Sequence, residues 1–578
     1  MKSTYATSIV LAGLFSLGLV SATPVTARAL KVSTDGSCGG TITCQGSTFG
    51  NCCSQYGYCG STAAYCGTGC QPGFGTCTGS TPISSKPSST SKAASTSKAS
   101  STSTPTPTGT NLSDCLNGKS VPVSWVSSPN YAGLAAPYNL RLPYKPVVIV
   151  IPTTAQHVQD AVTCAAKAGV KVQAKSGGHS YSSYSSGGKD GSMMIDLQSM
   201  QNIKLDTATG IVTVGGGVRL GNLAQGIYDQ GQRALPHGTC PGVGIGGHAT
   251  HGGYGHTSRN WGLAMDTIVG VDVVLANGTM VKVSSTQYPS IFWAVRGAAD
   301  SFGVAVNFYM QTNPAPTSVT YFEFSFPTMF NAKKTFTNSF LHLQDFAKNS
   351  SVIDNRISFG IYMDGSSYSV SGAFFGTVSE FNTKIKPELL RSLPTPSTPK
   401  VQSYGWIDYL TLVSGESTIS VPLTGYNKHD DFYAKSLTVP ESSGGLTATT
   451  LNTLYDYLLT GGDVSWFIIV NLYGGPKSSI NSKTTDFAAY SDRDSLWVFQ
   501  NYGETASSIN FIQGINDKVT QAQVGTTFGA YLNYVDPNLD AATAHKVYYG
   551  DALYAKLLAL KQLVDPQSVF WNPQAIGV

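Results

Sequence analysis

One glycine-rich stretch, residues 237–255, holds the side chain best suited to covalent chemistry. It reads HGTCPGVGIGGHATHGGYG, and Cys240 is its single sulfur nucleophile. So many glycines leave no hydrophobic face to bury, but they let the backbone approach a ligand closely and adopt unusual dihedral angles. We interpret the stretch as a loop around a large, flat, phosphate-bearing ligand, namely a flavin attached at Cys240. The other candidate contacts in it are Gly242, Val243, Gly244, Gly246, Gly247 and His248.

Two rival readings of this stretch are weaker. Gly242 to Gly247 matches GxGxxG, but a dinucleotide-binding fingerprint needs a strand before it and a helix after it. Leu-Pro-His-Gly precedes the match and a second glycine run follows it, so neither context is predicted. The histidines at 248, 251 and 256 could bind zinc, yet zinc ligands normally stand on rigid elements. We therefore expect no metal site.

The cysteines divide into a cluster, a pair and one left over. Eight of the 11 lie between Cys38 and Cys77, which in a secreted chain is typical of a disulfide scaffold. Cys115 and Cys164 can pair with each other. Cys240 is then unpaired, and a free thiol in a secreted protein is a liability unless it is buried or reacted.

The N-terminus predicts secretion. Lys2, an apolar run and a small-residue cleavage site make residues 1–22 a signal peptide, too short for a membrane span. Charged residues are 12% of the chain, about half the usual ~25%. The net charge of +4 predicts neither nucleic acid nor an anionic membrane as a partner. We expect an extracellular monomer, glycosylated at some of the sequons that begin at Asn111, Asn277 and Asn349.

Composition and residue patterns divide the chain into six segments. After the signal peptide and the cysteine cluster, a Ser/Thr/Pro-rich tether cannot bury enough apolar surface to fold. Beyond it, strand and helix patterns alternate, with a helix over 154–169, hairpins over 203–214 and 268–283, and one helix over 543–564. The expected segments are 1–22, 38–77, 78–110 (tether), 111–315 (cofactor domain), 316–530 (α+β substrate domain) and 531–578, which returns to the cofactor domain.

The cysteine cluster resembles the hevein-like chitin-binding module, most clearly in CCSQYGYCGSTAAYC, residues 52–66. Spacing alone leaves 105 possible pairings of eight cysteines. The resemblance implies Cys38–Cys53, Cys44–Cys59, Cys52–Cys66 and Cys70–Cys77. It also implies that chitin or N-acetylglucosamine oligomers bind through one hydroxyl and three aromatic rings that stack on sugar faces. These residues are Ser54, Tyr56, Tyr58 and Tyr65.

Residues 111–578 resemble the berberine-bridge-enzyme-like flavoproteins. The motifs are SGGHSY (176–181), the stretch 237–255, WAVRG (293–297) and FWNPQAI (570–576). The resemblance implies an α+β, two-domain vanillyl-alcohol-oxidase-type fold, here preceded by the hevein-like module on its flexible tether. It implies FAD attached twice, through His179 at the 8α position and Cys240 at carbon 6. The first loop adds Ser176, Gly177, Gly178 and Ser180 as cofactor contacts.

The most similar branch is the fungal glucooligosaccharide and chitooligosaccharide oxidases, which oxidise the reducing-end C1 hydroxyl to a lactone. That resemblance implies Tyr534 as the base, and Tyr181, Gln500 and Tyr531 as sugar contacts. Where the family has an aspartate, this chain has Asn471, which can donate a hydrogen bond to a phenolate but cannot take a proton. Val243 is associated in the family with oxygen access, so O2 and hydrogen peroxide are expected.

Three alternatives stay open at this stage. The enzyme could be a dehydrogenase that passes electrons to a quinone or a partner protein. It could oxidise a small alcohol or secondary metabolite, which Asn471 favours. It could also be a non-catalytic chitin-binding protein, although the intact loops around His179 and Cys240 argue against that.

Overall fold

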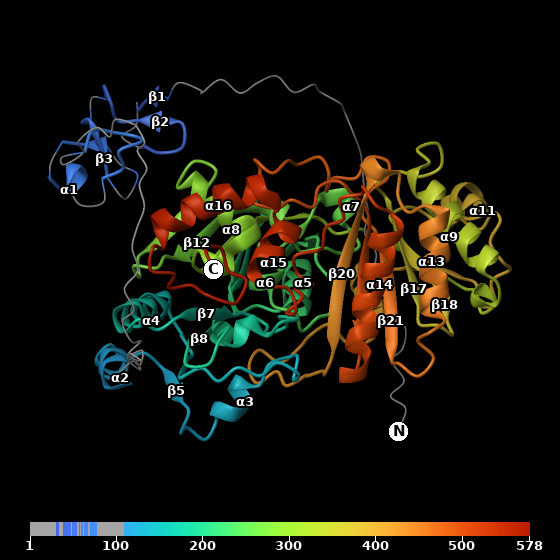
Figure 1. Ribbon diagram of the computed structural model, residues 1–578, viewed down its shortest axis with the longest axis horizontal. Helices are drawn as coiled ribbons and strands as arrows, with labels where there is room; N and C mark the ends of the chain where they lie inside the picture. The colour runs from blue at the N-terminus through green and yellow to red at the C-terminus, as the bar shows by residue number, and fades with distance from the viewer. Residues whose placement is uncertain are drawn as a thin grey trace, which may run out of the picture. The chain divides into compact units, whose positions relative to one another are not determined.

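The computed structural model describes most of the chain in two separate units, a small cysteine-rich module and a large unit (Figure 1). Within the described residues, no helix is long and apolar enough to cross a membrane. The expected signal peptide and tether, and the side chains of Tyr56 and Tyr58, lie outside the described residues. The described ranges are 30–33, 38–47, 49–54, 57, 59–61, 63–67, 70–77 and 109–578.

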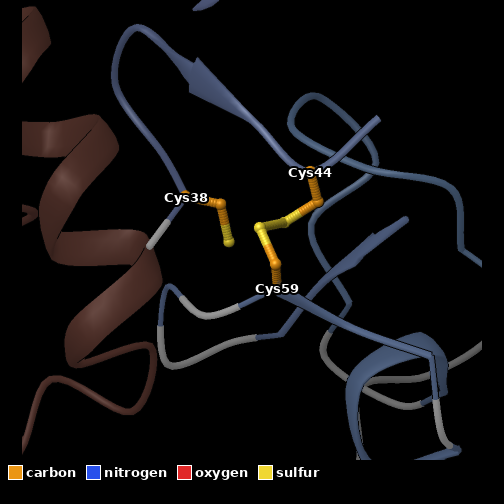
Figure 2. Close-up of side chains that lie close together, drawn as sticks. All are labelled: Cys38, Cys44 and Cys59. Carbon is orange, nitrogen blue, oxygen red and sulfur yellow. A yellow bond between two sulfur atoms is a disulfide. The ribbon is translucent and has the colours of Figure 1, made fainter. Parts of the chain in front are cut away.

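Disulfides make the centre of the small module. The four bonds are Cys38–Cys53, Cys44–Cys59, Cys52–Cys66 and Cys70–Cys77, the pairs that the hevein resemblance implies. The sulfur atoms of Cys38, Cys44 and Cys59 lie within 4.8 Å of one another (Figure 2). All three are bonded to other sulfur atoms, so none is a thiolate able to bind a metal. The secondary structure is β1 Lys31–Val32, β2 Ile42–Thr43, β3 Cys52–Cys53, β4 Cys59–Gly60 and α1 Ala63–Cys66.

The large unit begins with a four-stranded sheet in the order β5-β6-β8-β7, in which β6, β8 and β7 are parallel. Helix α4, Ala155–Ala168, crosses from β6 to β7. Thr154 caps its start by accepting from the His157 N–H, and Gly169 ends it at φ 67°. The Cys115–Cys164 disulfide joins α4 to α2. The bounds are α2 Gly109–Gly118, β5 Val123–Trp125, β6 Val148–Val150, β7 Val172–Lys175 and β8 Met193–Asp196.

A second, antiparallel sheet follows in the order β13-β12-β14-β10-β9. Both expected hairpins are present, and the second turns at Gly278, φ 80°, where glycine is favoured. Helix α5 supplies leucine and isoleucine side chains to the core under this sheet. The bounds are β9 Ile203–Asp206, β10 Ile211–Gly215, α5 Leu220–Gly231, β12 Ile268–Val274, β13 Met280–Ser284 and β14 Val304–Gln311.

The third sheet has seven antiparallel strands in the order β19-β16-β18-β17-β21-β22-β20. Helices α9, α13 and α14 pack on one face through a phenylalanine-rich core, as expected for this domain (Figure 1). On the other face, Val319, Tyr321 and Ala373 pack in a smaller cluster with Trp406, Tyr409 and Leu410. The bounds are β16 Val319–Ser325, α9 Lys333–Lys348, β17 Ile357–Met363, β18 Tyr368–Phe374, β19 Lys400–Tyr404, β20 Tyr433–Pro440, α13 Ala448–Leu458, β21 Trp466–Leu472, β22 Ser495–Gly503 and α14 Ile509–Ala522.

The C-terminal segment lies against the first two sheets. The single helix expected over 543–564 is wrong: Gly550, at φ 68°, separates α15, Ala541–Tyr548, from α16, Gly550–Val564. Buried Lys561 then donates to Asp565 (2.6 Å) and to the carbonyls of Ser301 (2.6 Å) and Phe570 (2.8 Å). These bonds tie the end of the chain to the loop before β14.

The glycine stretch contains one regular element that the sequence did not predict. Residues Ile245–Thr250 form a short helix, α6. No strand leads directly into it, so a dinucleotide-binding unit remains excluded. The other short elements are α3 Tyr131–Ala135, β11 Arg233–Ala234, α7 Ser258–Trp261, α8 Pro289–Ala298, β15 Asn313–Pro314, α10 Val378–Glu380, α11 Lys386–Leu389 and α12 Trp406–Ser414.

Candidate active site

Two glycine loops far apart in the sequence meet at one cleft. One loop, residues 176–180, follows β7, and the other leads into α6. A Cβ atom on Gly177 would lie 2.2 Å from the backbone nitrogen of Gly244, so only glycine permits this approach. The Oγ of Ser176 accepts from the N–H of Gly246 at 3.1 Å. Gly242 and Gly246 support the loops without lining the cleft. The candidate contacts that do line it are Ser176, Gly177, Gly178, His179, Ser180, Cys240, Val243, Gly244, Gly247 and His248.

Arg219, the residue before α5, holds these loops together. Its Nη1 donates to the carbonyl of Gly177 at 2.9 Å and also to that of Gly242. The guanidinium lies over the ring of Tyr426, 4.1 Å from its centroid. Arg219 is almost fully buried, and burial lowers its pKa, although Tyr426 and Asp196 oppose that effect. A buried cation is therefore fixed behind both loops.

His179 and Cys240 are the two nucleophiles of the cleft. His179 stacks on Tyr138 at 4.1 Å, and its buried Nε2 has no hydrogen-bond partner among the described residues. Burial, with help from Arg219 and Lys428, lowers the pKa of His179 to about 3, so the imidazole is neutral and nucleophilic. Cys240 is a free, exposed cysteine. The surrounding protein raises the pKa of its thiol, and Lys428 acts in the opposite direction.

The histidines of α6 have separate structural roles. His248 Nε2 accepts from the N–H of Gly238 at 3.1 Å, and burial lowers the pKa of His248 to about 3. His251 Nε2 lies 3.3 Å from Asp300. Burial would lower the pKa of His251, but the carboxylate outweighs burial and raises it. These partners explain the histidines without a metal.

Tyrosines from three segments form the opposite wall of the cleft. The ring of Tyr181 stacks on that of Tyr534 at 5.3 Å, and Gln500 on β22 donates to the Tyr181 hydroxyl at 2.6 Å. The rings of Tyr531 and Tyr534 meet edge to face at 4.9 Å. Burial raises the pKa of Tyr181 well above its usual value, and it raises that of Tyr531 to about 12. The structure thus brings together all the expected sugar contacts and the expected base.

Asn471 is placed differently. It lies on β21, next to Val498 of β22 and Gly360 of β17, and is 1% exposed. Neither its Nδ2 nor its Oδ1 has a hydrogen-bond partner among the described residues. It makes no hydrogen bond to Tyr534, and it does not line the cleft. Two unsatisfied buried polar atoms are costly, and no described residue compensates for them.

Sequence reasoning missed several residues of this cleft. Tyr138 and Arg219 carry no motif, and only the tertiary structure brings them to the glycine loops. Asp300 could have been suspected, because it lies three residues after the WAVRG motif. The additional polar residues that line the cleft include Gln173, His251, Asp300, Asn572 and Gln574.

Two families match separate parts of the large unit. Residues 146–284 match the FAD binding domain family, and residues 530–577 match the family described as berberine and berberine like. The first match contains both glycine loops with His179 and Cys240. The second contains Tyr531, Asn533 and Tyr534. Both walls of the cleft therefore carry family signatures.

Characterised relatives cover the same part of the chain. A xylooligosaccharide oxidase of Thermothelomyces thermophilus and a chitooligosaccharide oxidase of Gibberella zeae are each 36% identical over 476 residues, 80% of this chain and 94% of theirs. The solved structure of a xylooligosaccharide oxidase from Myceliophthora thermophila C1 with xylobiose has a TM-score of 0.76 and 36% identity, covering 81% of this chain and 99% of that one.

A second solved structure bears on the two nucleophiles. It is a glucooligosaccharide oxidase from Acremonium strictum, described with a 6-S-cysteinyl, 8α-N1-histidyl FAD. It is 31% identical to this chain, covers 81% of it and 99% of its own length, and has a TM-score of 0.75. With its FAD binding domain, this chain belongs to the berberine-bridge-like FAD-linked oxidoreductases, in the branch of the oligosaccharide oxidases.

Proposed function

We propose that FAD occupies the cleft between the glycine loops and is attached through both His179 and Cys240. The residues fit this cofactor: the buried Nε2 of His179 lacks a partner, and Cys240 is free. Because the two loops are rich in glycine, backbone atoms rather than side chains would lie next to the cofactor. Arg219 keeps the two loops in a fixed relation, so one flavin ring can reach both nucleophiles.

The proposed reaction is oxidation of the reducing-end C1 hydroxyl of an oligosaccharide to a lactone. Bound FAD supplies a two-electron acceptor that takes the hydrogen from carbon 1. The sugar hydroxyl loses its proton to Tyr534, while Tyr181, Gln500 and Tyr531 orient the sugar. The single observation that carries this proposal is that these tyrosines and the two nucleophiles face the same cleft.

Asn471 is proposed to act from β21 as a neutral hydrogen-bond donor. Its amide has no hydrogen-bond partner among the described residues, so it is free to donate to a developing phenolate, but it cannot accept a proton. The Asn471→Asp variant, which restores the residue type of the resembled family, would show whether the neutral side chain sets the pH profile. A change in that profile supports the role, and an unchanged profile argues against it.

We propose chitooligosaccharides as the substrate and O2 as the electron acceptor. The hevein-like module and the named chitooligosaccharide oxidase relative support the substrate, and Val243 in the cleft wall supports oxygen access. Chito-, xylo- and cello-oligomers of equal length, compared by product mass and peroxide yield, test both points. Faster turnover of xylo-oligomers would contradict the substrate. Turnover with a quinone dye far above that with O2 would contradict the acceptor.

The module is proposed to hold the secreted, monomeric enzyme near chitin. Ser54 is buried beside β3, and the ring of Tyr65 covers Gly60, whose Cβ would clash with it at 2.3 Å. The Ser/Thr/Pro-rich composition of the tether, about thirty residues, predicts a root-mean-square span of roughly 30 Å by the ~5–6 Å × √n relation, which would raise the local enzyme concentration at the surface. Deleting residues 38–77 should abolish retention on insoluble chitin and leave turnover of soluble oligomers nearly unchanged. A tenfold loss of soluble turnover would contradict independent domains.

A further inference from the structure

The hydroxyl of Tyr531 is surrounded by hydrogen-bond donors. Its Oη accepts from the backbone N–H of Gly253 at 3.0 Å, from that of Tyr254 at 3.2 Å, and from Asn533 Nδ2 at 3.0 Å. Tyr531 is only 3% exposed. Across the described residues, no acceptor receives the hydroxyl's own proton.

This arrangement suits a phenolate better than a phenol. A neutral hydroxyl has two acceptor lone pairs and one proton to donate. The two backbone N–H groups already match both lone pairs, and Asn533 adds a third donor. An ionised oxygen, with three lone pairs and no proton, would match all three donors. Consecutive backbone N–H groups of this kind form a nest, which favours an anion.

The glycine stretch is shaped around this oxygen. Gly252 and Gly253 adopt φ 127° and 83°, which turn the N–H groups inward. A Cβ on Gly252 would lie 2.7 Å from the Tyr531 ring. Asn533 also contacts the carbonyls of His248 and His251 at 3.2 Å each, so its amide is fixed by α6 and shares its two hydrogens among three oxygens.

The three donors favour ionisation of Tyr531 over that of the other cleft tyrosines, although burial outweighs them. Burial raises its pKa to about 12, while the three donors lower it and Asp492 raises it slightly. Tyr254 and Tyr473 face it from the glycine stretch and from the end of β21, and Tyr534 from its own segment. Tyr534 has no donor to its hydroxyl, and burial raises its pKa further, with Tyr531 adding to the effect.

We propose that Tyr531 is the tyrosine of the reactive site that ionises first, and that the proton lost by the sugar comes to rest on its phenolate. This rests on the proposed function. The sugar O–H bond breaks and its proton binds Tyr534 Oη, while the former Tyr534 proton binds Tyr531 Oη. The electron pair left on the sugar oxygen forms the carbonyl bond as carbon 1 passes its hydrogen, together with the bonding electron pair, to the cofactor as a hydride. Tyr531 then releases its proton to solvent. Asn533 is a positioning residue for this charge.

The test compares Asn533→Ala with Ser436→Ala in the flavin-loaded enzyme. Ser436 Oγ accepts from the backbone N–H of Tyr531 at 3.1 Å and does not touch its hydroxyl, so it is a matched control. The first readout is the ¹³Cζ signal of labelled tyrosine without sugar, assigned to Tyr531 by its absence in Tyr531→Phe. The second is the pH profile of kcat/KM. Since the base must be ionised, kcat/KM should rise with pH to a plateau.

Loss of one donor to the phenolate should raise the Tyr531 pKa by about 1 to 2 units. The pH at which kcat/KM rises should increase by the same amount. Asn533→Asp should raise both further, because it replaces a donor with an anion. Ser436→Ala should change neither. An unchanged Tyr531 titration in Asn533→Ala would overturn the proposal. A pH profile of kcat/KM that does not shift together with the Tyr531 titration would also overturn it. If the NMR shift occurs but the native enzyme oxidises no sugar, the proposed function fails and the phenolate site stands.

Discussion

The two walls of the cleft are built in different ways. The loop wall, residues 176–180 and 237–255, is defined by backbone atoms in van der Waals contact, with Arg219 bridging two of its carbonyls. The tyrosine wall, formed by Tyr181, β22 and residues 531–534, is defined by side chains that stack and hydrogen-bond. In the proposed function, the cofactor meets the first wall and the sugar meets the second.

This difference sets how each wall should respond to substitution. Where backbone meets backbone, any added atom forces the loops apart, and the interior is too densely packed to absorb it. Where side chains meet, a lost hydrogen bond weakens one contact and leaves the strand that carries it intact. A single substitution in the loop wall should therefore have a large effect on stability and flavin content. A single substitution in the tyrosine wall should have a smaller effect, limited to the contact that is lost.

The largest expected effect is on cofactor attachment. His179→Ala and Cys240→Ala should each leave FAD on one bond, and the double variant should release all its FAD when denatured. The reason is that each loop contributes one available nucleophile. Flavin fluorescence of the acid-precipitated protein, with peptide mass analysis, measures this. Full release of FAD from the unmodified protein would show that the loops only enclose the cofactor.

Next in size is an added methyl group in the loop wall. Gly244→Ala would place a Cβ 2.0 Å from the Gly177 nitrogen, so we expect a loss of about 3 kcal/mol in unfolding free energy and a fall in flavin content. Gly462→Ala is the control, because nothing lies within 4 Å of the added atom and the residue does not line the cleft. Chemical denaturation and the flavin-to-protein absorbance ratio are the measurements. Equal losses in both variants would break the comparison between the walls.

The loop wall was also the part most open to prediction from sequence. Glycine-rich spacing and an odd cysteine indicate close backbone approach and a free nucleophile, whatever the surrounding fold. The helix α6 inside the stretch was missed, because glycine disfavours helices in general. Tertiary contacts support it here: Ser176 accepts from the Gly246 N–H, and Asn533 donates to the His248 carbonyl. The break at Gly550 was missed because the apolar pattern continues across it.

The tyrosine wall depends on pairing between distant strands, which local patterns do not encode. Gln500 reaches Tyr181 across 319 residues of sequence, and Arg219 reaches both loops without any motif. Tyr531, Tyr534 and Gln500 were expected only through resemblance to a family. The donors around Tyr531 had no sequence signal apart from glycines at 252 and 253, whose positive φ angles become meaningful once the fold is known.

A smaller effect is expected in the tyrosine wall. Gln500→Ala removes the donor to the Tyr181 hydroxyl, so the ring should stack less firmly on Tyr534, and kcat/KM should fall roughly tenfold through KM. Flavin content and unfolding free energy should stay close to native. The control is Gln402→Ala on the edge strand β19, which is exposed. Loss of flavin from Gln500→Ala would show that the tyrosine wall also holds the cofactor.

The smallest effect concerns the ion pair in the loop wall, His251 with Asp300. The pKa of His251 is raised by Asp300, so its contribution to stability is complete below the ordinary value of 6.5 and is lost as pH rises through the folded value. The pKa of Asp300 is lowered, although burial alone would raise it, so its contribution is present above 3.8 and is lost as pH falls. The pair should therefore stabilise the protein mainly between about pH 4 and 6.5. A double-mutant cycle with Asp300→Asn and His251→Gln should give a coupling of about 1 kcal/mol near pH 5.5 that declines by pH 9. A coupling of several kcal/mol would mean that charge, rather than backbone contact, holds this wall together.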